Sequence, residues 1–405
     1  MKNKCTEDAL IKISESIYAN LNLRNKVTGL FIDFKKAFDL VDHNILLRRL
    51  EEIGIRGVAL SWFGSYLMGR TQSVRVGDAL SSPLNITSGV PQGAVLSANL
   101  FLIFINSLLT QPLVGRVNAF ADDIAIFYFA KDIKTIESDI KHDLDLLRSW
   151  CVHNKMQINV EKTKFINFDH ASFVFENPIK YHDSNCLKQE PCACKSIEKV
   201  SSFKYLGVIF DEKLTWEPHI ATLHSKLKYS IRKFYYLRHF CDQHLLKTLY
   251  FAIVQSRLQY GINCWGAAYN YLVHRLRTTQ NHFIRIILKK KIRDSSFPLF
   301  KELNILPVEH LFVYKVLKQF YLRSGNIASN DYSYYITRGC SNNVFKLPKV
   351  NKSLFKRSNF YLGPKLFNAL PSKVKNCNSF NHFSKELRKW IFEISDIFSL
   401  TMVIV

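Results

Sequence analysis

Residues 117–129 read VNAFADDIAIFYF, in which two short apolar runs flank a pair of adjacent carboxylates, Asp122 and Asp123. Two such runs separated by a short polar turn predict a β-hairpin with both carboxylates at its tip. A tight hairpin normally takes Asn-Gly or Asp-Gly there, because its turn needs positive φ, and this tip has no glycine. Adjacent carboxylates held against an apolar sheet repel each other unless a cation lies between them. The tip is therefore either a divalent-metal site or an exposed, solvated acidic turn.

A third carboxylate interrupts a buried strand earlier in the chain. Val27–Phe34, VTGLFIDF, is almost entirely apolar or β-branched, and Asp33 near its end is costly to bury without a partner. An amphipathic helix is predicted before this strand, over Glu7–Leu21, because apolar residues recur there at helical spacing. A second helix is predicted after it, and we expect Asp42 and Asp39 to act as helix N-caps.

The remaining pattern alternates strands and helices before becoming wholly helical. The predicted elements are a strand at 71–76, a glycine-bearing loop opening into an apolar helix at 95–108, a helix at 133–150, a turn and strand within 156–168, a polar loop or loose hairpin at 169–199, a hairpin at 203–210, and helices beyond 219. The region after Asn326 shows weaker periodicity, which predicts a small accessory region with mobile links. The fold class is therefore α+β, with a helix-backed sheet followed by an all-helical half.

The charge of the chain predicts a polyanionic partner. Lys and Arg number 56 against 33 Asp and Glu among 405 residues, a net charge of +23. Between Lys226 and Arg293 there are fourteen bases and one acid, Asp242. A surface that is merely solvated mixes both signs, so this bias favours a nucleic-acid backbone. No run approaches the roughly 18 apolar residues of a membrane span and the N-terminus is not a signal peptide, so we expect a nuclear or cytoplasmic protein without a membrane partner.

The nine cysteines are odd in number and scattered, which predicts that most are reduced. One cluster stands out, formed by Cys186, Cys192 and Cys194 near His182. Its C-x5-C-x-C spacing matches no standard zinc pattern. We therefore expect a reduced surface loop here in preference to a zinc site.

Five motifs occur in a fixed order along the chain. They are FIDFKKAFDLVDH around Asp33, SGVPQGAVLSANLF, FADD at 120–123, INVEKTKF and FKYLGV. Together they resemble the successive motifs of a reverse transcriptase, and more narrowly those of the non-LTR (LINE-type) retrotransposon polymerases. SRLQYGINCWG and RSNFYLGPKLFNALP resemble the thumb and post-thumb parts of those proteins. The resemblance covers nearly the whole chain and favours the metal site over the solvated turn.

The resemblance implies a right-hand polymerase palm, an antiparallel sheet backed by helices, followed by an all-helical thumb. In such a palm Asp33, Asp122 and Asp123 would hold two Mg²⁺ ions, with Mn²⁺ as the alternative metal. Lys162 resembles the lysine that gives a proton to the leaving pyrophosphate, although Lys164 is equally near in sequence. The implied partners are an RNA template, a DNA primer and deoxynucleoside triphosphates.

The resemblance also implies a nucleotide pocket. Phe38 is similar in position to the aromatic gate under the incoming sugar, and its alternative role is a helix core residue. Gln92, followed by Gly93, matches the glutamine of the family's nucleotide pocket. Residues 205–208 would form the primer grip.

Four parts are expected from these motifs. They are a remnant of the fingers and entry helix at 1–25, the palm at 26–221, the basic helical thumb at 222–325 and the accessory region at 326–405.

Several positions depart from the family pattern. Ala94 stands where serine is common, Ser97-Ala98 replaces a usual Gly-Pro, and Asn106 begins a tripeptide that lacks the usual aspartate. The chain also begins after the family's finger strands, so we expect an N-terminally truncated chain. Two functions follow from this: an RNA-directed DNA polymerase, or a catalytically inactive nucleic-acid-binding remnant of one. A third hypothesis is a nucleotide cyclase with a palm-like sheet. The Pro-Gln-Gly loop and the basic helices count against it, because they would have no role in such an enzyme.

Overall fold

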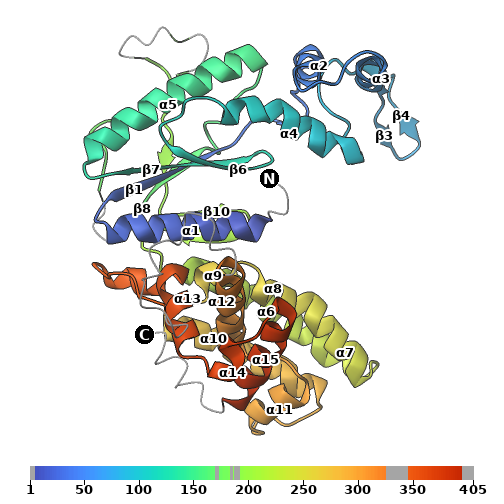
Figure 1. The fold of residues 1–405 in the computed structure, drawn as a ribbon. Helices are drawn as coiled ribbons and strands as arrows, with labels where there is room; N and C mark the ends of the chain where they lie inside the picture. The colour runs from blue at the N-terminus through green and yellow to red at the C-terminus, as the bar shows by residue number, and fades with distance from the viewer. Residues whose placement is uncertain (1–4, 169–172, 183–185, 187–191, 325–344, 395–405) are drawn as a thin grey trace. The chain divides into compact units, whose positions relative to one another are not determined.

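The computed structural model describes residues 5–168, 173–182, 186, 192–324 and 345–394. Its contacts divide the chain into two compact units, residues 26–205 on one hand and residues 1–25 with 206–405 on the other (Figure 1). One helix, α6 (Glu217–Leu237), runs through position 221, where we placed the end of the palm. The four-part division remains a prediction.

A five-stranded sheet with the order β6-β7-β1-β8-β9 forms the centre of the unit at 26–205. Its strands are β1 (Lys26–Ile32), β6 (Arg116–Phe120), β7 (Asp123–Ala130), β8 (Lys164–Phe168) and β9 (Glu198–Lys199). The central strand β1 is antiparallel to both β7 and β8. Gly29 of β1 lies against the rings of Phe127 and Phe168, and an added Cβ would come within 2.9 Å of the first ring. The predicted strand and hairpin are confirmed.

The long helix at 133–154 packs on the sheet because its apolar stripe faces the strands. The helices of this unit are α2 (His43–Glu52), α3 (Val58–Leu67), α4 (Val95–Leu109) and α5 (Ile133–Asn154). In Figure 1, α5 lies across one face of the sheet. Its side chains Ile136, Ile140 and Leu147 are fully buried in one core with Leu30 and Ile126 of the strands. This packing fixes the strands that carry the acidic residues.

The strand predicted at 71–76 is instead two short strands. β2 (Thr71–Gln72) pairs with β5 (Leu84–Asn85), and β3 (Arg75–Val76) pairs with β4 (Ala79–Leu80). All eight residues are exposed. The single-strand prediction was wrong because no apolar layer supports a continuous strand here, and the chain reverses at Gly77, where φ is +61°.

The second unit is almost entirely helical, as predicted. Its elements through residue 324 are α1 (Thr6–Asn22), β11 (Val208–Asp211), α6, α7 (Gln243–Tyr250), η1 (Phe251–Gln255), α8 (Ser256–Gln259), α9 (Ile262–Trp265), α10 (Asn270–Ile287), α11 (Ser296–Glu302) and α12 (Val308–Ser324). β10 (Ser202–Tyr205) is the last strand of the first unit, so two strands form over the predicted hairpin at 203–210.

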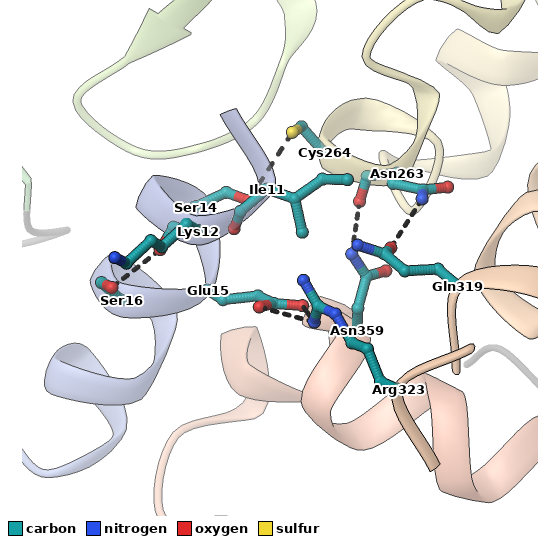
Figure 2. A network of polar contacts seen from close by, with 10 residues as sticks. All are labelled: Ile11, Lys12, Ser14, Glu15, Ser16, Asn263, Cys264, Gln319, Arg323 and Asn359. Atoms are coloured by element: carbon teal, nitrogen blue, oxygen red, sulfur yellow. Dashed lines mark hydrogen bonds and ion pairs between the residues drawn. The ribbon is translucent and has the colours of Figure 1, made fainter. Parts of the chain in front are cut away.

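Polar contacts attach α1 to the helices that follow much later in the chain (Figure 2). Arg323 of α12 donates to both carboxylate oxygens of Glu15, at 2.8 and 3.0 Å. The Ser14 hydroxyl lies 3.6 Å from the sulfur of Cys264 in α9. Glu15 is only 5% exposed, so the ion pair compensates a charge that would otherwise be buried alone.

The C-terminal region is more ordered than its sequence indicated. It contains η3 (Ser353–Arg357), α13 (Asn359–Asn368), α14 (Ser372–Lys375) and α15 (Phe380–Glu393). Leu362, Phe383 and Leu387 are fully buried. The weak periodicity of this sequence reflects helices that are short, one of which contains Pro364. Residues 325–344 and 395–405, where mobile links of the accessory region could fall, lie outside the described residues.

Among the helices that the structure describes, none is both long enough and apolar enough to cross a bilayer.

Candidate active site

The pairing of strands brings the carboxylates together from distant parts of the sequence. In the antiparallel register of β1 and β7, Ile32 lies opposite Ile124. One step further along this register, Asp33 comes opposite Asp123. The β6–β7 hairpin pairs Phe120 with Asp123, so its turn consists of Ala121 and Asp122. Three carboxylates therefore meet at one end of the two central strands.

The hairpin turn is strained. Ala121 adopts φ +53°, in the left-handed region that residues with a Cβ avoid. This conformation costs roughly 1–2 kcal/mol and is maintained by the pairing of β6 with β7. It is the turn that glycine would normally occupy. Strain retained in a conspicuously acidic turn is typical of functional sites.

The carboxylates act on one another electrostatically. The pKa of Asp123 is raised, first by burial and then by the negative charges of Asp122 and Asp33. A divalent cation would reverse this balance, because it favours the ionised form of every carboxylate around it. The donor set consists of hard oxygens, which Mg²⁺ prefers. The residues present therefore fit a divalent-metal site.

A cavity of about 440 Å³ opens beside these residues. Asp33, Asp123 and Lys162 line it, so three of the residues predicted from the sequence meet at one cavity. Asp122 is exposed in the adjoining turn and is not part of the lining. The other lining residues are Phe31, Ile32, Ile124, Glu161, Lys164, Val200, Phe203 and Tyr205.

The backbone of Asp33 is fixed from the turn that precedes β8. Its N–H donates to the Thr163 hydroxyl at 3.2 Å, and its carbonyl accepts from the Asn159 N–H at 2.8 Å. We did not predict these two supporting residues. Both belong to the INVEKTKF motif, and an asparagine at the start of a polar turn is the signal that could have indicated them.

The hairpin tip is fixed by Tyr205, for which we predicted only a primer-grip role. Its single hydroxyl proton is shared between the carbonyl oxygens of Asn118, at 3.1 Å, and Asp123, at 3.3 Å, and its oxygen accepts from the Asn118 amide at 3.1 Å. Its ring packs beside Phe31, 5.5 Å away between centroids. Burial raises the pKa of Tyr205 to about 12, so the hydroxyl remains a donor throughout the neutral range.

The two candidate lysines differ in their surroundings. Lys164 is paired with Glu198 across β8 and β9, with 2.5 Å between Nζ and Oε2. Lys162 lies in the preceding turn, where its N–H donates to the Asn159 carbonyl at 3.2 Å, and its side chain is exposed at the cavity. Because Lys164 is engaged by a carboxylate, Lys162 is the better candidate for a proton donor.

The loop predicted to hold a nucleotide packs against the turn after β1. The Gln92 amide donates to the Asp39 carboxylate at 2.8 Å, and Phe38 stacks on Phe101 with 4.4 Å between ring centroids. Gly89 comes so close to Asp39 that an added Cβ would lie 2.9 Å from its Cα. Phe38, Gln92 and the exposed Gly93 lie outside the lining of the cavity described above.

The N-cap predictions had different outcomes. Asp42 caps α2, accepting from the Ile45 N–H at 3.0 Å, as predicted. Asp39 does not cap a helix, because it lies in a turn and its carboxylate binds Gln92 instead. That prediction was wrong.

Comparison with known proteins decides the family. The model of the family described as reverse transcriptase (RNA-dependent DNA polymerase) matches residues 2–210, more than half of the chain. The chain belongs to the reverse transcriptase family. The order of motifs in the sequence predicted this, and the predicted α+β fold class is confirmed.

Similar proteins come from non-LTR retrotransposons. The chain is 27% identical over 299 residues to the probable RNA-directed DNA polymerase from transposon X-element of Drosophila melanogaster, and 26% identical over 292 residues to that from mobile element jockey of the same organism. Each match covers 70% of this chain and 30% of the relative. The chain thus spans about a third of the length of these relatives. An apo telomerase structure from Candida Tropicalis aligns over 82% of this chain and 56% of its own, at 12% identity and a TM-score of 0.36, too weak to carry an argument.

Reverse transcriptase domains use divalent metal ions, which agrees with the oxygen-rich site at the hairpin tip. Helix α6 of the helical unit carries a cationic and aromatic surface. Four exposed bases and three exposed tyrosines share this helix: Lys226, Lys228, Tyr229, Arg232, Lys233, Tyr235 and Tyr236. Such a mixture of cationic and aromatic side chains suits a nucleic-acid strand.

Some bases and aromatic residues of this region are structural instead. Arg277 is buried and pairs with Glu309 at 3.2 Å, and Phe234 is fully buried. The basic bias of the sequence therefore overstates the charge that is available to a partner.

Proposed function

We propose that the chain is the RNA-directed DNA polymerase domain of a non-LTR retrotransposon, which extends the 3′ end of a DNA primer on an RNA template with deoxynucleoside triphosphates. One observation carries this proposal: the β1–β7 register that brings Asp33 opposite Asp123, beside Asp122, at a cavity lined by Lys162. The family supports it, since the relatives described above are named as RNA-directed DNA polymerases.

Asp33, Asp122 and Asp123 would hold two Mg²⁺ ions. When bound, these ions activate the attacking oxygen and stabilise the charge that develops on the leaving group. In the reaction, the primer 3′ oxygen forms a bond to the α-phosphorus and the bond from that phosphorus to the bridging oxygen of pyrophosphate breaks. Lys162 would give its proton to the departing pyrophosphate. Tyr205 keeps Asp123 in place by holding its backbone carbonyl.

The loop around Gln92 would receive the incoming nucleotide. Asp39 accepts one hydrogen of the Gln92 amide and so fixes its orientation, leaving the amide oxygen for a ligand. Gly93, at φ +82°, has no side chain to obstruct a close approach. Phe38 is anchored on Phe101 and would support the sugar.

Primer extension on a primed RNA template tests the proposal. Asp122→Asn removes a ligand charge with almost no change of shape, so incorporation of dNTP should fall below detection. Asp78→Asn makes the same change at an exposed turn between β3 and β4 and should extend at the wild-type rate. Extension by Asp122→Asn at the wild-type rate would reject this assignment of the site.

A second candidate is a catalytically inactive nucleic-acid-binding remnant. Ala94, Ser97 and Asn106 favour it, because they depart from the family's usual residues near the nucleotide loop. This candidate predicts salt-sensitive binding of primer–template by the wild-type chain without extension. Gain of extension after Ala94→Ser would support it, whereas extension by the unaltered chain would exclude it.

A further inference from the structure

The connection between β8 and β9 contains a cluster that the polymerase reaction does not use. His182, Cys186, Cys192 and Cys194 each present a nitrogen or sulfur atom, and these atoms all lie within 4.8 Å of one another. Each of the four side chains is half-buried. All the cysteines that the structure describes, including these three, are thiols outside any disulfide.

An isolated antiparallel bridge brings the two ends of the cluster together. Lys180 pairs antiparallel with Ser196, and two backbone hydrogen bonds, of 2.7 and 3.3 Å, flank this pair. Two steps further along the same register, His182 comes opposite Cys194. Residues opposite each other in an antiparallel pair have Cβ atoms about 4.5–5.5 Å apart, close enough to share a ligand. The unusual C-x5-C-x-C spacing therefore reflects ligands brought together across this bridge, which a rule based on sequence spacing does not detect.

The distances match those of a tetrahedral zinc centre. His182 Nδ1 lies 3.4 Å from Cys186 Sγ and 3.6 Å from Cys192 Sγ. Zinc bonds of about 2.3 Å to sulfur and about 2.0 Å to nitrogen, at tetrahedral angles, separate the two ligand atoms by about 3.5 Å. A hydrogen bond accounts for only one of these contacts, because Nδ1 has a single lone pair or a single proton.

Charge and anchoring also fit a metal. Zinc with three thiolates and a neutral imidazole carries one net negative charge, and the Lys180 ammonium lies 3.9 Å from Cys192 Sγ, where it offsets this charge. Arg148 of α5 donates to the Cys186 carbonyl at 3.0 Å and so fixes the middle of the connection. The soft sulfur and nitrogen donors select zinc over the hard Mg²⁺ expected at the hairpin tip.

We propose that His182, Cys186, Cys192 and Cys194 form a structural zinc site. All four coordination positions come from the protein, which is the mark of a structural and not a catalytic centre. The ion would constrain the connection between β8 and β9. The first residues of these two strands, Lys164 and Glu198, form an ion pair, and Lys164 lines the cavity.

Metal analysis of the purified full-length chain tests this site. Mass spectrometry of the metals should find one zinc ion per chain, and reconstitution with Co²⁺ should give the visible bands of a tetrahedral thiolate site. Cys192→Ser should abolish both signals, and Cys192→His, which restores a nitrogen ligand, should recover the bound metal. Cys241→Ser is the matched control, because Cys241 is similarly half-buried but lies outside the cluster, and it should keep the wild-type zinc content.

A second measurement needs no variant. A thiol-blocking mercurial added to the folded chain should release one equivalent of zinc to a colorimetric chelator. Zinc and cobalt both absent from the folded wild-type chain, or zinc retained in full by Cys192→Ser, would overturn the proposal. So would iron in place of zinc, or a disulfide among the three cysteines in freshly purified protein. None of these readouts depends on polymerase activity.

Discussion

Removal of the Tyr205 hydroxyl should impair both stability and catalysis, because this group links the hairpin tip to the rest of the sheet. Tyr205→Phe preserves the ring and its packing on Phe31 but leaves the Asn118 amide and two carbonyl oxygens without their partner. The side chain is only 3% exposed, so water replaces these bonds poorly. Leaving a buried polar group unsatisfied costs about 1–3 kcal/mol. We expect the free energy of unfolding to fall by about this amount.

The effect on catalysis follows from the bond to Asp123. If the same energy is lost from positioning this carboxylate in the transition state, kcat falls about 5- to 140-fold, since roughly 1.4 kcal/mol corresponds to a factor of ten. Urea unfolding measures the first effect and single-nucleotide extension at saturating dNTP the second. Tyr271→Phe, at a side chain that is 59% exposed, is the control and should change neither.

One combination of results from the two assays would contradict a role for the Tyr205 hydroxyl in positioning Asp123. Tyr205→Phe that is destabilised as expected yet extends primers at the wild-type rate would mean that the hydroxyl supports the fold alone. A loss seen only in KM for the nucleotide would likewise contradict a role in positioning Asp123.

Three further predictions concern the other groups. Lys162→Ala should slow single-turnover extension by about 10²- to 10⁴-fold, the usual contribution of a general acid, whereas Lys164→Ala should slow it less. Equal losses would contradict the assignment of Lys162 as the proton donor. Replacing both Arg232 and Lys233 by glutamine should weaken primer–template binding. The slope of log K against log salt concentration should fall by about 0.7–0.9 for each phosphate that the variant no longer neutralises. An unchanged slope would mean that α6 is not part of the interface. Burial lowers the pKa of His219 from 6.5 to about 4, so between these pH values the imidazole is protonated in the unfolded chain but neutral in the folded chain. Stability that is present above pH 6.5 is therefore lost as the pH falls toward 4. His219→Gln should reduce the pH dependence of the unfolding free energy, measured in urea titrations, by one proton.

The strands that hold the acidic site were predictable because their apolar runs are long and clearly bounded. β1 and the β6–β7 hairpin followed from the pattern alone, and so did the two carboxylates at the tip. The missing glycine showed that ordinary turn chemistry explains this tip poorly, and the structure places Ala121 there at positive φ. Support by Tyr205 was not predictable, because it depends on which side chain reaches which backbone atom across strands far apart in sequence.

Elements with little apolar pattern were the ones that sequence reasoning misjudged. The exposed strands at 71–76 have no core to define their period, and α13 is short and contains Pro364. The cysteine cluster was judged by its spacing along the chain, whereas His182 and Cys194 face each other through the register of an isolated bridge. Spacing rules apply where one turn carries the ligands, and here segments on both sides of this bridge contribute them.

The central claim is that Asp33 and the hairpin-tip carboxylates bind the same metal. Titration of the chain with Mn²⁺, followed by electron paramagnetic resonance with primer–template and dNTP present, tests it most directly. We predict that Asp33→Asn, on a different strand from Asp122 and Asp123, lowers Mn²⁺ binding as much as Asp123→Asn does, while Asp78→Asn binds like the wild type. Mn²⁺ binding by Asp33→Asn that equals the wild type would contradict the account.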